Sequence, residues 1–135
     1  MFNHIAPPSK LPASAEYHVF REGIKPDWDD ENNKGGGRWV VQCGKDKVDG
    51  IWKLAVLAAI GEVLESSDNG RNLVCGLTCN VKYDVHKIYL WTSISKEKEQ
   101  TEALGRIFKE NLDFLGEISF LPHDNSNPLN PTFVV

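Results

Sequence analysis

The 135-residue chain contains no long hydrophobic run and only three cysteines. Its longest apolar run, Leu54 to Ile60, is far shorter than the roughly 20 residues that span a bilayer. Its N-terminus lacks the basic and apolar regions of a secretory signal. The odd number of cysteines argues against a disulfide framework and favours reduced thiols in the core. These absences predict a cytoplasmic protein, with the nucleus as a further location, and no membrane partner.

Motifs of catalysis and metal binding are also missing. The chain has no phosphate-binding loop, no Gly-x-Ser-x-Gly elbow and no His-Glu-x-x-His metal signature. Its four histidines are scattered, and the pair Cys75 and Cys79 has no second Cys or His pair at zinc spacing. The sequence therefore predicts that the protein is not an enzyme, with no catalytic residues, no metal and no cofactor.

The composition is that of an ordinary globular protein, with 41% hydrophobic and 25% charged residues and a formal net charge of −4. A negative chain disfavours non-specific binding to long nucleic acids, whose phosphates need cationic partners. A local cationic pocket for a single nucleotide is still compatible with this charge. The length suits one core, so residues 1–135 are expected to form a single domain.

Hydrophobic periodicity predicts an α+β fold. Residues 1–16, rich in Pro, Ser and Ala, are expected to form an extended lead-in. Strands are expected at 17–24, 38–43, 73–82, 87–92, 117–121 and 133–135. Helices are expected at 50–65, with Asp49 as the N-cap, and at 96–112. The short segment 83–86 indicates a hairpin, so antiparallel pairing with helices on one face of the sheet is favoured.

The four tryptophans differ in what their surroundings predict. Trp52 lies on the helical stripe and Trp39 in a strand, and both are expected in the core. Trp28 lies in a polar loop between acidic residues, where a large apolar ring is unusual. That indole either folds back on the core or serves as a recognition platform, and the sequence leaves both interpretations open.

The predicted hairpin carries a second candidate feature. If Lys82 and Lys87 flank its turn, they face each other, which is unfavourable unless an anion lies between them. A period of two places Tyr89 and Trp91 on the same face as Lys87. Two ammonium groups beside an indole suit a phosphate attached to a flat ring. The alternative is a solvated hairpin tip, since charged residues are common at turns.

Together these residues predict a site for a positively charged purine. A 7-methylated guanine would stack on Trp28 through dispersion and a cation–π term. The carboxylate of Asp29 would accept hydrogen bonds from the N1 and N2 edge. Lys82 and Lys87 would hold the phosphates. The remaining expected members of the site are Arg38, which assists with the phosphates, and Trp91, which lines the pocket near the methyl group.

Several segments carry a resemblance to a known family. The longest runs from Phe20 to Trp39 and contains the loop tryptophan and a Gly-Gly-Arg-Trp block. Further matching segments are Asn3–Ile5, Trp52, Ile60–Glu62, Cys75–Gly76, Asn80–Lys82, Lys87–Thr92 and Phe133–Val135. On these residues the chain resembles the translation initiation factor 4E family, which binds the 7-methylguanosine cap of messenger RNA. The resemblance implies a curved antiparallel sheet with helices on its convex face and the cap on the concave side.

The resemblance also assigns roles within the site and marks departures from the family's pattern. It matches Trp28 to one of two stacking tryptophans, and the second belongs to strands and a helix expected before Met1. Asp29 replaces a Glu that recognises the guanine edge. Lys82 replaces an Arg and therefore lacks the planar guanidinium group that can bind a phosphate through two hydrogen bonds. Asp84 replaces a basic residue. Lys87, Arg38 and Trp91 match the family's pattern. These departures predict weakened cap binding.

The convex surface of the family binds helical segments of initiation factor 4G and of repressor proteins. The resemblance assigns this partner-binding surface to Trp52, Lys53, Leu54, Leu57 and Glu62. Here Lys53 takes a usually apolar position and Leu54 a usually acidic one, while Leu57 is retained. The alternative function is therefore a truncated paralogue that acts as an interaction or decoy protein without effective cap binding.

Overall fold

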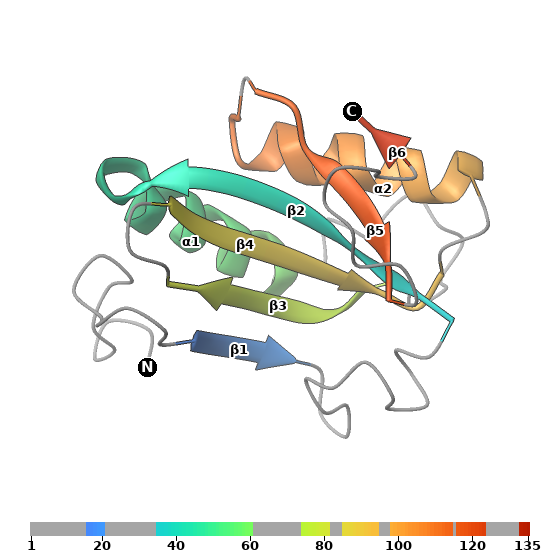
Figure 1. The fold of residues 1–135 in the computed structure, drawn as a ribbon, viewed down its shortest axis with the longest axis horizontal. Coiled ribbons are helices and arrows are strands. Elements are labelled where there is room, and N and C mark those ends of the chain that lie inside the picture. The colour runs from blue at the N-terminus through green and yellow to red at the C-terminus, as the bar shows by residue number, and fades with distance from the viewer. Residues whose placement is uncertain are drawn as a thin grey trace.

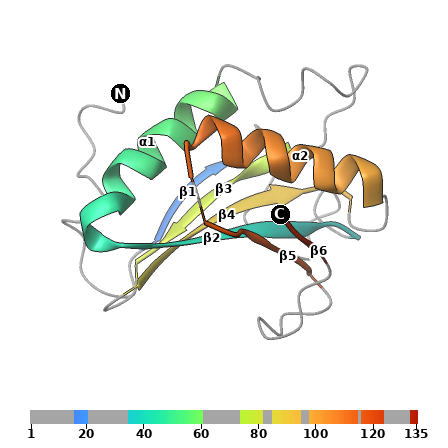
Figure 2. The ribbon, with the colours of Figure 1, turned by 90° about the horizontal axis from the view of Figure 1, so that it is seen from above.

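A computed structural model describes residues 16–20, 35–60, 74–81, 85–94, 98–114, 116–123 and 133–135 (Figure 1). The elements are β1 (Glu16–Phe20), β2 (Gly37–Gly44), α1 (Lys45–Ile60), β3 (Val74–Asn80), β4 (Val85–Thr92), α2 (Lys98–Asn111), β5 (Ser119–Pro122) and β6 (Phe133–Val134). The strands form one antiparallel, curved sheet in the order β1-β3-β4-β2-β5-β6. Both helices cover its convex side (Figure 2), so the predicted α+β class and layer arrangement are confirmed.

The core lies between the sheet and the two helices. Trp39 of β2 is fully buried there, and its indole N–H donates a hydrogen bond to the carbonyl oxygen of Thr101 at 3.1 Å. Trp52 of α1 is 2% exposed and stacks on Tyr17 of β1, with ring centroids 6.3 Å apart. Both tryptophans are therefore core residues, as predicted, and each fastens a helix to a different part of the sheet.

The three cysteines are free and buried, which confirms the prediction of reduced core thiols. Burial raises the pKa of Cys43 to about 11 and the pKa of Cys79 to about 12, and nearby acids and the neighbouring thiol add to the shift. Among the described residues, no group of His, Cys, Asp and Glu could hold a metal ion. No helix in the described ranges is long and apolar enough to cross a membrane.

The predicted start of the first helix, at Gly50 with Asp49 as N-cap, is wrong. The helix begins at Lys45 and places Asp49 inside it. Val48 is fully buried, so the apolar stripe that includes Trp52 already begins at Val48, one turn before that tryptophan. Asp46 lies in the first turn, where a carboxylate is stabilised by the helix dipole. A glycine at position 50 suggested a boundary, but the stripe continues through it.

Two further corrections concern β1 and the hairpin. Glu16 pairs with Asn80 as the first residue of β1, so the lead-in expected over 1–16 does not reach that far; residues 1–15 lie outside the described residues. The ladder between β3 and β4 pairs Lys87 with Asn80. The prediction that Lys82 lies directly opposite Lys87 is therefore wrong, because the two strands are offset by two residues from that register. Lys82 itself lies outside the described residues.

Candidate functional site

The candidate site is the face of β2 and β4 that the helices leave uncovered (Figure 2). Along β4 the side chains alternate, with His86, Ile88 and Leu90 buried, and Lys87, Tyr89 and Trp91 partly exposed. This confirms that the last three share one face. The register pairs Arg38 with Trp91 and Gln42 with Lys87 across the two strands. Antiparallel partners lie on the same side of a sheet, so both cations and the indole share this face.

Arg38 is held over an aromatic ring. Its guanidinium carbon lies 5.7 Å from the centroid of the Tyr89 ring, within the range of a cation–π contact. Partial burial lowers the pKa of Arg38, and burial raises the pKa of Tyr89 against the opposing effect of the guanidinium. Arginine nevertheless keeps its charge in proteins. The site therefore contains a poorly hydrated cation, which a bound anion would stabilise.

A cavity of about 240 Å³ lies beside these residues. Arg38 and Lys87 supply its positive charges, and Glu117 supplies a carboxylate. The rest of its lining is Val40, Gln42, Tyr89, Ser119 and Leu121. A cavity with two cations and several hydrogen-bonding groups suits a phosphate or another small anion, while Glu117 offsets part of the positive charge.

Aromatic rings surround Trp91 at the other end of this face. Its ring centroid lies 5.2 Å from that of Phe20 in an edge-on arrangement, and 4.7 Å from that of His123. Gly76 makes room for Phe20, because a Cβ at this glycine would lie 2.4 Å from the ring. The indole nitrogen of Trp91 is buried, and no described residue accepts a hydrogen bond from it. The ring is thus fixed in place by its aromatic neighbours, and its N–H is enclosed.

The structure brings together three of the six predicted cap-site residues: Arg38, Lys87 and Trp91. The other three, Trp28, Asp29 and Lys82, lie outside the described residues. Sequence reasoning missed Glu117 and Ser119 as lining residues. Their signal was the alternation of 117–121, which places Ile118 and Phe120 in the core and their neighbours on the opposite face.

The predicted partner surface on α1 divides into buried and exposed residues. Lys53 is exposed, and Leu54 and Leu57 are 39% and 55% exposed. Trp52 is buried, so it offers almost no surface and instead fixes the position of the helix. Glu62 lies outside the described residues. The described part of α1 therefore presents two adjacent leucines to solvent.

The fold is that of solved translation initiation factors. The chain is 36% identical to Ascaris suum eIF4E-3 in its complex with the m7G cap, with a TM-score of 0.88 over 99% of this chain and 76% of that one. Caenorhabditis elegans eIF4E-3, in complex with the 4E-binding protein Mextli, is 28% identical, with a TM-score of 0.89 and coverage of 99% and 77%.

The family model described as eukaryotic initiation factor 4E matches residues 1–133, and the chain belongs to this family. Its members are initiation factors and not enzymes, as predicted. A curated relative is translation initiation factor 4E-1 of Nicotiana tabacum, 34% identical over 130 residues, which are 96% of this chain and 57% of the relative. The chain thus spans little more than half the length of the curated relatives that it matches.

Proposed function

We propose that the chain is a single cap-binding domain, acting in the cytoplasm in translation initiation or its regulation. The observation that carries the proposal is the common face of Arg38, Lys87 and Trp91, three positions to which the family resemblance assigns cap contacts. The Ascaris suum relative is known in complexes with m7G and m2,2,7G caps. The ligand class is therefore a methylated guanine nucleotide with its phosphates.

Each residue of the proposed site has a chemical role. Lys87 and Arg38 neutralise the phosphates, together with Lys82. Trp28 stacks on the methylated base, and Asp29 accepts hydrogen bonds from the guanine edge. Trp91 lines the space near the methyl group.

The proposal includes weakened affinity. Asp29 is one methylene shorter than the Glu of the family pattern, and Lys82 lacks the bidentate geometry of Arg. Glu117 shares a cavity with Arg38 and Lys87, so part of their charge is already compensated. We expect binding to be weaker than that of the Ascaris suum factor by about 1.5–3 kcal/mol, the size of one lost hydrogen bond to a charged group.

Titration of 7-methyl-GTP followed by tryptophan fluorescence tests the proposal, with GTP as the control ligand. Preferential binding of the methylated nucleotide, reduced by Lys87→Ala, supports it. Equal binding of both nucleotides, or affinity unchanged in both Lys87→Ala and Trp28→Ala, would contradict the assignment of the site.

The second candidate is an interaction or decoy protein, and the exposed leucines of α1 favour it. Leu54 and Leu57 present an apolar surface that suits a helical segment of initiation factor 4G or of a 4E-binding repressor. The Caenorhabditis elegans relative is known in complex with the 4E-binding protein Mextli. Pull-down with the Mextli 4E-binding segment, compared between the parent chain and Leu57→Asp, tests this function separately from cap binding.

A further inference from the structure

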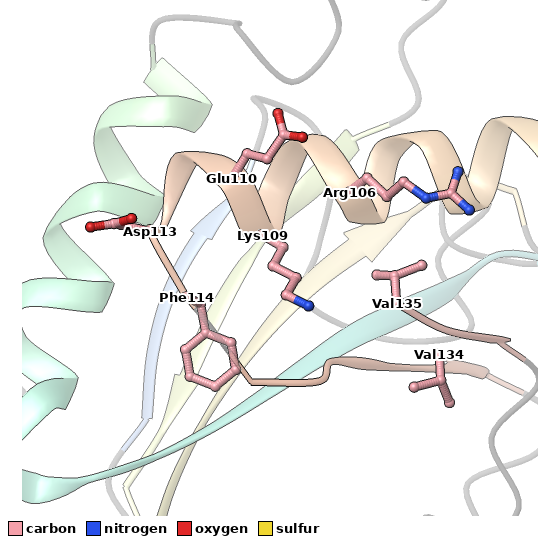
Figure 3. Close-up of a pocket in the computed structure, with 7 residues that line it drawn as sticks. All are labelled: Arg106, Lys109, Glu110, Asp113, Phe114, Val134 and Val135. Atoms are coloured by element: carbon pink, nitrogen blue, oxygen red, sulfur yellow. The ribbon is translucent and has the colours of Figure 1, made fainter.

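A second cavity, of about 540 Å³, lies on the helix side of the sheet between the end of α2 and strand β6 (Figure 3). Its lining residues are Arg106, Lys109, Glu110, Asp113, Phe114, Val134 and Val135. None of them belongs to the proposed cap site or to the exposed leucine surface of α1. The volume is within the range of sites that bind small molecules or a few residues of a peptide.

The turn that ends α2 builds one wall of this cavity. The amide of Phe114 donates to the carbonyl oxygen of Lys109 at 3.2 Å, and the amide of Asp113 donates to that of Glu110 at 3.1 Å. Asp113 has a positive φ of 52°. This pair of bonds around a left-handed residue is a Schellman motif. It turns the chain back beneath the helix, so the Phe114 ring lies below Lys109 in Figure 3.

The charges around the cavity are arranged asymmetrically. In Figure 3 the Lys109 ammonium points from α2 toward the strands, between Phe114 and Val135, while the carboxylates of Glu110 and Asp113 point away. Among the described residues, Lys109 takes no part in an ion pair. Arg106 lies one turn before Lys109 on the same helix. The cavity therefore combines a cation with apolar walls.

The adjacent sheet edge offers main-chain hydrogen bonds. Strand β6 ends the strand order, and no other described strand pairs with its outer side. The amide of Val135 donates to Ile118 at 3.1 Å, and the amide of Ile118 donates back to Val135 at 2.9 Å. In an antiparallel ladder such bonded residues alternate with residues whose N–H and C=O point outward. Val134 therefore directs both groups away from β5, and its side chain is 43% exposed.

We propose that this cavity and the edge of β6 bind an extended peptide segment of a partner protein, with an acidic residue next to apolar ones. The peptide pairs with the N–H and C=O of Val134, as in strand addition to a sheet edge. Its carboxylate approaches Lys109 and Arg106, and an apolar side chain packs against Phe114 and Val135. Complementary charge selects the acidic segment over a basic one.

Fluorescence anisotropy with the full chain tests the proposal. The probe is a fluorescein-labelled peptide Ser-Val-Glu-Val-Glu-Ser, and the control probe carries Lys in place of both Glu. We expect the acidic probe to bind at least fivefold more tightly. Lys109→Ala should weaken it at least fivefold, whereas Lys98→Ala, an exposed lysine at the other end of α2, should not. A probe that carries an N-methyl group on the backbone amide of its second Val should lose binding, although the protein itself is unchanged.

Amide chemical shifts identify the binding surface in the same experiment. Changes centred on Lys109, Phe114 and Val134 support the proposal. Equal binding of the two probes, equal effects of the two lysine variants, or no binding of the acidic probe at about 1 mM would overturn it. Displacement of the probe from these amides by a ten-residue oligouridylate would show a nucleic-acid surface instead and would also overturn it.

Discussion

Gly105 of α2 lies directly against the indole ring of Trp39: a Cβ at this glycine would lie 2.4 Å from the ring carbon Cζ2. The absence of a side chain lets the helix approach the sheet closely enough for Trp39 to reach the Thr101 carbonyl. Gly50 of α1 is the matched case in the other helix, since a Cβ there would meet no atom within 4 Å.

We therefore predict opposite effects for the same substitution in the two helices. Gly105→Ala should lower the free energy of unfolding by about 1–3 kcal/mol, because the added methyl overpacks the core. Gly50→Ala should raise it by about 0.5–1 kcal/mol, because alanine favours the helix. Urea unfolding followed by circular dichroism measures both. A destabilised Gly50→Ala, or a neutral Gly105→Ala, would show that the helix positions are wrong.

The end of α2 gives a second stability prediction. Asp113 adopts a left-handed conformation, and its carboxylate lies at the negative end of the helix dipole. Asp113→Gly should stabilise the protein by about 0.5–1 kcal/mol, since glycine takes this conformation without strain. Asp113→Ala, which removes the charge but keeps a Cβ at this left-handed position, is the control. If Asp113→Ala stabilised the protein as much as Asp113→Gly, the gain would come from removing the carboxylate at the negative end of the helix dipole, and not from relief of backbone strain.

The cation pair of the proposed cap site predicts a dependence on phosphate number. Lys87→Ala should weaken binding of 7-methyl-GTP more than binding of 7-methyl-GMP, and should make the salt dependence shallower. Glu117→Gln should strengthen binding of 7-methyl-GTP more than binding of 7-methyl-GMP and should make the salt dependence steeper, because it removes the acid that shares the cavity. Isothermal titration at two salt concentrations measures both. Lys53→Ala on the exposed side of α1 is a charge-matched control that should leave both affinities unchanged.

The buried thiols predict how the protein responds to pH. With the pKa of Cys43 near 11 and that of Cys79 near 12, both thiols stay protonated and unreactive in the fold at pH 9. Unfolding restores ordinary values near 9, so the unfolded chain binds fewer protons between about pH 9 and pH 12. Stability from this source is therefore intact below pH 9 and falls as the pH rises through that window.

Iodoacetamide labelling at pH 9 measures this protection directly. We expect alkylation of Cys43 and Cys79 in the folded protein to be at least tenfold slower than in urea. Mass spectrometry of the digested protein resolves the individual sites. Rapid labelling of either residue without denaturant would contradict its burial.

The sequence predicted those features that depend on local periodicity. Trp39 and Trp52 were expected in the core because each lies in an apolar pattern, and Lys87, Tyr89 and Trp91 were expected on one face because strand side chains alternate. The start of α1 was not predicted, because Gly50 resembled a boundary while Val48 already continued the stripe. Local pattern identifies an element more reliably than its ends.

Features that depend on pairing between segments far apart in the chain could not be predicted from the local sequence pattern. The register of Asn80 with Lys87 follows from the whole β3–β4 ladder, and two flanking lysines do not determine it. Glu117 lines the same cavity as Arg38 only because β5, which follows it in the chain, pairs with β2. The packing of Phe20 and His123 on Trp91 likewise joins three separate parts of the chain.

The strand order has a consequence for synthesis of the chain on the ribosome. Trp39 of β2 has Leu90 of β4 on one side and Phe120 of β5 on the other, and both are translated later. At roughly 5–20 residues per second, Phe120 follows Trp39 by roughly 4–16 seconds. During that interval the edge of β2 that pairs with β5 has no strand partner, whereas β3 and β4 can pair with each other, and β4 with β2, as soon as they emerge. Because such non-local contacts slow folding, we expect the β3–β4 hairpin to form before β5 closes the other edge of β2.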